Sequence, residues 1–199
     1  MFLVYGVHLI LTLAFIVNTI GIMSHEGRKA LIRPAIPETL IRQRYQTEGW
    51  AYGLANILTL LSKGPNIAVK LKEMLDKQWE ILNQATQESQ GTIDDVVTAQ
   101  IGMISAYLGI LAELDQNPLE QVVAKLPQKA SCAAGKFHGL IVGFNERTAG
   151  EAIIPEEEII TSVNKEWQNM GVPQPVNIES FKQGYNVGLT EVRQTLLVS

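Results

Sequence analysis

The sequence predicts an all-α fold, in which a single N-terminal transmembrane helix precedes a bundle of about six or seven helices. Three observations predict it: an apolar run from Phe2 to Met23, long segments with helical spacing of apolar residues, and no convincing strand pattern. The 199 residues suit a domain of about 150 residues plus an appended segment. We expect a transmembrane anchor over 1–23, a basic juxtamembrane linker over 24–36 and a helical domain over 37–199.

The apolar run carries no formal charge and is long enough to span a membrane, because about 20 helical residues cross the hydrocarbon core. A cleaved signal peptide would need a basic start and a small-x-small cleavage site. Nothing basic precedes this run, and Thr19 with Gly21 makes a poor cleavage site. We therefore favour a retained anchor. Cleavage, a buried core helix and translation from Met23 remain as alternatives.

Basic residues follow the apolar run and set its expected direction. Five Lys or Arg residues against two Glu residues lie between positions 24 and 46, and no basic residue precedes them. The positive-inside rule then places the C-terminal domain on the cytoplasmic side, or on the equivalent side of an organelle. We expect Arg28, Lys29 and Arg33 to contact anionic lipid head groups at the membrane interface. A solvated basic linker is the alternative.

The helical domain is expected to begin with two helices. Pro37 at the first helical position, followed by Glu38, starts one that runs to about Ser62, with a break expected near Gly49. The second begins at Asn66 and is an amphipathic helix of about 25 residues.

A third helix is expected from Thr92, as the cap with Asp95 three residues later, to about Asp115. Its residues 96–112 carry no charge, so a second membrane span is an alternative. Nearby acidic residues and the lack of basic flanks favour a central buried helix instead.

Asn117 and Pro118 are expected to open a short helix that ends near Leu126. The next segment contains glycines every four residues, which on a helix form a smooth ridge where another backbone can approach closely. These helix-packing glycines are Gly135, Gly139 and Gly143. A strand through "FHGLIVGF" and a membrane-inserted helix are the alternatives.

Two further helices complete the prediction. Pro155 and the three following Glu residues start one, since acidic side chains favour the N-terminal end of a helix, and Gly171 ends it. The last begins near Ile178 and carries two more glycines at the same spacing, Gly184 and Gly188.

No constellation of catalytic or ligand-binding residues emerges from the sequence. Cys132 is the only cysteine, which excludes a disulfide and a multi-cysteine metal site. It lies six positions from His138, which matches no nucleophile signature, and His25 has no second histidine at metal spacing. We predict no cofactor and no metal. A net charge of -4 also argues against nucleic-acid binding.

Three functions remain open. We favour a membrane-anchored interaction module, an accessory or assembly subunit whose partners are membrane lipid and either other proteins or further copies of itself. The second is a membrane-bound enzyme or small-ligand binder with an apolar pocket between helices. The third is a structural or pore-forming protein in which the glycine-repeat helix also inserts.

Overall fold

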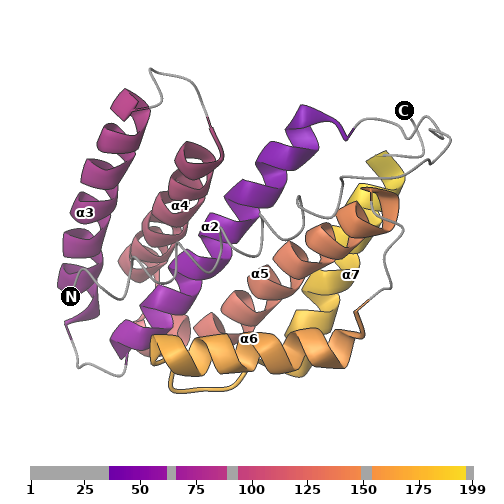
Figure 1. The fold of residues 1–199 in the computed structure, drawn as a ribbon. Coiled ribbons are helices and arrows are strands. Elements are labelled where there is room, and N and C mark those ends of the chain that lie inside the picture. The colour runs from indigo at the N-terminus through magenta and orange to yellow at the C-terminus, as the bar shows by residue number, and fades with distance from the viewer. Residues whose placement is uncertain (1–35, 62–65, 89–93, 149–153, 196–199) are drawn as a thin grey trace, which may run out of the picture. The chain divides into compact units, whose positions relative to one another are not determined.

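A computed structural model describes residues 36–61, 66–88, 94–148 and 154–195 (Figure 1). These residues form six α-helices and no strand, which confirms the all-α class. In chain order the helices are α2 (Glu38–Leu61), α3 (Ile67–Glu88), α4 (Asp95–Gln116), α5 (Leu119–Thr148), α6 (Glu156–Met170) and α7 (Ile178–Thr195). The expected anchor over 1–23 and the three basic residues after it, Arg28, Lys29 and Arg33, lie outside the described residues.

Two predicted breaks are wrong. α2 continues through Gly49, which packs directly against the backbone of α4 at Ala99. The two helices expected between Asn117 and residue 150 are one helix of 30 residues, α5, with Pro127 in its interior. The apolar stripe that enters the core continues across the proline, since Val122 precedes it and Ala130 follows it, and both are buried. Burial of that stripe outweighs the backbone hydrogen bond that proline removes.

The start of α4 also differs from the prediction. Asp94, not Thr92, is the N-cap, and its Oδ1 accepts a hydrogen bond from the backbone N–H of Val97 at 2.8 Å. Both residue types suit a cap, and the prediction chose the wrong one. The expected stop of α6 is confirmed, because Gly171 adopts the left-handed conformation at φ 81° that glycine tolerates.

Two pairs of parallel helices form the centre of the domain. α2 lies along α4, and α5 lies along α7, with the backbones so close that glycine is required on both sides of each contact. A Cβ atom at Gly49 would overlap the carbonyl oxygen of Ala99, and one at Gly102 would overlap that of Gln46. In the second pair, Gly135 faces Phe181 and Gly184 faces Cys132 in the same way.

The two pairs have the same register and therefore form an internal structural repeat. The shift in residue number that relates Gly49 to Gly135 also relates Gly53 to Gly139 and Gln46 to Cys132. A second constant shift relates α4 to α7, so that three close glycine contacts of the first pair have counterparts in the second. The paired contacts are Gly49 to Ala99 with Gly135 to Phe181, Gly102 to Gln46 with Gly184 to Cys132, and Gly53 to Met103 with Gly139 to Tyr185.

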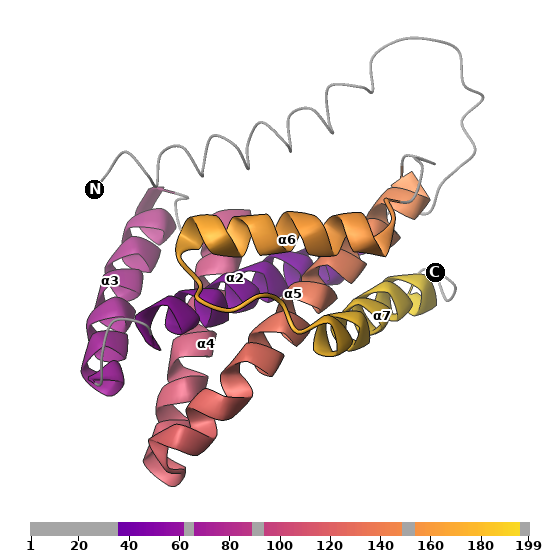
Figure 2. The same ribbon diagram turned by 90° about the horizontal axis from the view of Figure 1, so that it is seen from below.

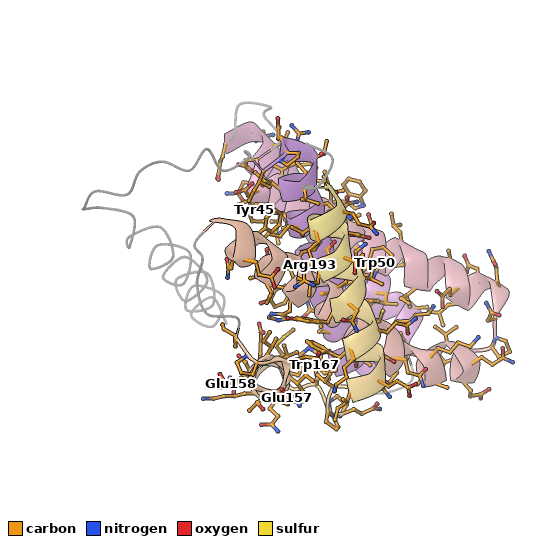
Figure 3. The ribbon with its side chains drawn as sticks, turned by 90° about the vertical axis from the view of Figure 1, so that its right-hand side faces the viewer. Tyr45, Trp50, Glu157, Glu158, Trp167 and Arg193 are labelled. Carbon is orange, nitrogen blue, oxygen red and sulfur yellow. The ribbon has the colours of Figure 1, made fainter. Side chains whose placement is uncertain are left out.

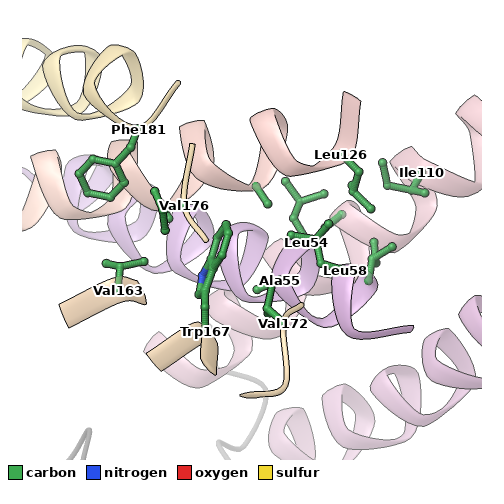
Figure 4. Close-up of a cluster of buried hydrophobic side chains, with 14 of the residues drawn as sticks. Leu54, Ala55, Leu58, Ile110, Leu126, Val163, Trp167, Val172, Val176 and Phe181 are labelled. Atoms are coloured by element: carbon green, nitrogen blue, oxygen red, sulfur yellow. The ribbon is translucent and has the colours of Figure 1, made fainter. Parts of the chain in front are cut away.

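The two halves meet where α2 packs antiparallel against α5. Leu40, at the start of α2, clusters with Leu140 and Phe144 in the second half of α5. At the other end, Leu54 and Leu126 lie in the main core, as Figure 4 shows. α3 packs on α4, whereas α6 crosses α2 and α5 on one side (Figures 1 and 2).

We expect Gly135→Ala to lower the free energy of unfolding by about 2–3 kcal/mol, because the new methyl group would push apart two backbones. Gly109→Ala is the matched control. Its Cβ would lie 3.4 Å from the Trp50 ring, an ordinary contact, so the better helix propensity of alanine should raise stability by up to about 1 kcal/mol. Urea unfolding followed by circular dichroism measures both. Equal effects of the two substitutions would contradict the close-contact account.

Candidate functional site

A cavity of about 560 Å³ lies between the two halves of the repeat. Ligand pockets in proteins commonly have volumes of about 300–1,000 Å³. Four helices line it, with α2 and α4 on one side and α5 and α7 on the other. The lining residues are Gln46, Thr47, Trp50, Leu54, Gly109, Ile110, Glu113, Lys129, Cys132, Ala133, Lys136, Gly184 and Val187. We call this the inter-repeat cavity.

Most of the cavity wall is apolar. Two of its lining residues, Leu54 and Ile110, are buried in the core, with 1% and 4% of their surface exposed. Trp50 is 37% exposed and Val187 is 44% exposed, so large apolar surfaces also reach the opening. In Figure 3, Trp50 lies beside α7 and away from α6, whose Glu157 and Glu158 are at another edge of the domain. The cavity therefore opens on the side that α6 does not cover.

Two ion pairs connect α5 to its neighbours at the cavity. Lys129 pairs with Glu113 of α4, and Lys136 pairs with Glu191 of α7 at 2.9 Å. Glu191 also accepts a hydrogen bond from the Gln43 side chain at 2.5 Å. These side chains are about one-third exposed, so each pair contributes at most about 1 kcal/mol to stability. Their main effect is to fix where two ammonium groups lie.

A polar cluster lies where α6 packs on α2. The Tyr52 hydroxyl donates to Glu166 at 2.5 Å, and burial together with the Glu166 charge raises the pKa of Tyr52. Burial also raises the pKa of Glu48, an effect that Arg44 partly opposes. Burial and a hydrogen bond to Asp95 raise the pKa of Tyr45 to about 12. Burial thus disfavours the charged forms of Tyr45, Glu48 and Tyr52.

A second, small cavity of about 20 Å³ adjoins this cluster, and its volume suits one water molecule. Tyr52 and Glu166 line it together with His138 and Trp167. Trp167 extends from α6 towards the core near Ala55 (Figure 4). Burial lowers the pKa of His138 to about 4, so the imidazole is neutral at pH 7. His138 occupies in α5 the repeat position that Tyr52 occupies in α2.

The glycines singled out from the sequence all lie between α5 and α7. Gly135 and Gly139 face the α7 backbone, Gly184 and Gly188 face the α5 backbone, and Gly143 faces the Val192 side chain. The sequence reading missed the equivalent glycines of the first pair, Gly49, Gly53 and Gly102. The four-residue spacing in "GWAYG" is the signal that would have found two of them.

Cys132 and His138 line different cavities, so the fold does not unite them as a nucleophile and a base. Among the residues that the structure describes, no group of three His, Cys, Asp or Glu side chains could hold a metal ion. Within the same ranges, one helix, α4, is long and apolar enough to cross a membrane, judged by length and composition alone.

Comparisons with protein-family models, with curated proteins and with solved structures find no match to this chain. The case for a function therefore rests on the chain's own residues.

Protonation of His138 should make stability depend on pH. The unfolded chain takes up this proton near pH 6.5, whereas the folded chain does so only near pH 4. The stability contributed by the neutral imidazole is therefore complete above pH 6.5 and is lost as the pH falls to 4. Between pH 7 and pH 4, we expect the free energy of unfolding to fall by about 3 kcal/mol less in His138→Gln than in the unmodified chain. Urea unfolding at pH 7 and pH 4 measures the difference, and identical losses would exclude this role for His138.

Proposed function

We propose that this protein is a membrane-anchored helical domain that binds a small, largely apolar ligand in the inter-repeat cavity. The observation that carries the proposal is the cavity itself, which is large, mostly apolar and open beside Trp50. The anchor is the apolar run over 1–23, and the basic residues after it place the domain on the cytoplasmic or equivalent side.

The arrangement supports binding rather than catalysis. A small-molecule site needs a few polar groups that converge on an apolar cavity, and here Gln46, Thr47 and two lysines supply them. An enzyme would also need a nucleophile or a base within reach of the bound molecule. Cys132 lines the cavity, but His138 lines the other one.

Filling the cavity tests the proposal. Ala133→Trp places an indole among the lining residues, and Ala68→Trp is the matched control on the exposed surface of α3. We expect the full chain, released from membranes in mild detergent, to retain a small molecule in non-denaturing mass spectrometry. The control should retain it, and Ala133→Trp should lose at least nine-tenths of it (about 1.4 kcal/mol or more). An unmodified chain without any adduct, or a well-folded Ala133→Trp that keeps it, would contradict the proposal.

A second candidate function is an interaction module that assembles with other proteins at the membrane. The outer face of α4 supports it, because Ile101 is 37% and Leu108 is 45% exposed, and Ser105 and Ala112 on the same face carry no charge. An exposed helix face without charge is typical of a surface that another protein covers. A pore-forming role would require α4 to leave the bundle and insert.

Charge on this face tests the second candidate. We expect Leu108→Glu to reduce the size of the complex that mild detergent extracts from membranes, since a buried unpaired carboxylate opposes association. Gln87→Glu, at an exposed position of α3, is the control. Native gel electrophoresis gives the size. Complexes of the same size for all three chains would argue against assembly through α4.

A further inference from the structure

We infer that the ligand of the inter-repeat cavity is a single-chain amphiphile with an anionic head group, such as a long-chain carboxylate, with its head group at Lys136. This inference rests on the proposed binding function and specifies its chemistry. Three features of the cavity carry it: the sign of its charge, the unequal surroundings of its two lysines, and the shape of its apolar part.

The charged groups that line the cavity favour an anion. They are Lys129, Lys136 and Glu113, so the lining itself carries two ammonium groups and one carboxylate, while Glu191 pairs with Lys136 from outside the lining. The remaining polar side chains of the lining, Gln46 and Thr47, are few. A sugar would leave most of its hydroxyl groups without a partner, and a polyphosphate would need more cations than these two. A ligand with one anionic group attached to an apolar chain matches these few charged and polar side chains.

The two lysines differ in what surrounds them. Glu113, the partner of Lys129, itself lines the cavity and would repel an anion bound there. Glu191, the partner of Lys136, does not belong to the lining and is held by Gln43 as a second donor. An ammonium group has three donors, so Lys136 can keep Glu191 and bind a carboxylate as well. The head group is therefore assigned to Lys136.

The apolar part of the lining combines exposed and buried side chains. Val187 and Trp50 lie at the opening, whereas Leu54 and Ile110 are buried. Gly109 and Ala133 are also in the lining and carry little or no side chain, which leaves room for a narrow chain. Burial of each methylene group would favour binding, whereas the carboxylate would remain near the opening.

The single cysteine of the chain provides the readout, because Cys132 lines the cavity between the two lysines. The experiment measures the rate at which a water-soluble maleimide alkylates Cys132 in the full chain, held in phosphatidylcholine nanodiscs. We expect hexadecanoate to slow alkylation at least 10-fold, and hexadecanol, which has the same chain without the charge, to slow it less than 3-fold. Lys136→Gln should remove this difference, and Lys136→Arg should keep it.

Lys125→Gln is the matched control, since it removes the same charge from an exposed position of the same helix. It should leave the protection by hexadecanoate unchanged. Nanodiscs that contain phosphatidylglycerol, without added hexadecanoate, test whether the anionic group can come from a bilayer lipid. Protection there that depends on Lys136 would show that a two-chain bilayer lipid supplies the anionic group and would overturn the single-chain ligand.

Several results would overturn the inference. Equal protection by hexadecanol and hexadecanoate would show that the cavity takes apolar chains without regard to charge, which leaves the proposed binding function intact. If Lys129→Gln, but not Lys136→Gln, loses the stronger protection by hexadecanoate than by hexadecanol, the head group does not bind at Lys136. Absence of protection by either compound would reject an acyl ligand. The proposed binding function would then be tested separately, by the small-molecule adduct in mass spectrometry.

Discussion

The close approach of two pairs of helix backbones is the constraint on which the rest of this domain depends. Where Gly49 meets Ala99 and Gly135 meets Phe181, no side chain separates the helices. Such contacts bring Cα–H groups near carbonyl oxygens and allow many dispersion contacts per turn. They also fix each pair as a rigid unit, so the space between the pairs, rather than within them, is where a cavity can form.

The internal repeat is symmetric in its backbone and asymmetric in its side chains. Trp50 corresponds to Lys136, Gln46 to Cys132 and Tyr52 to His138. One half thus contributes an aromatic surface to the inter-repeat cavity where the other contributes an ammonium group. The same pattern of close contacts could therefore be kept while the two sides of the cavity diverged in chemistry.

The helices were largely predictable from the sequence, and the cavity was not. Periodicity and the glycine at 171 located the helices, because these signals are local. The continuity of α5 through Pro127 depends on buried neighbours, so local rules failed there. The cavity depends on which helices pair: Lys129 and Glu113 come from different helices, and no spacing in the sequence brings them together. The glycine spacing in "GKFHG" indicated close packing without naming the partner helix.

Parallel pairing has a consequence for how the chain folds. Because α2 packs along α4 and α5 along α7, the strongest contacts skip the helix that follows each first member. Each close contact therefore joins segments separated by a whole helix, α3 or α6, and such non-local contacts slow folding. During synthesis, the first half becomes able to close only once α4 has emerged, and the second half repeats that event.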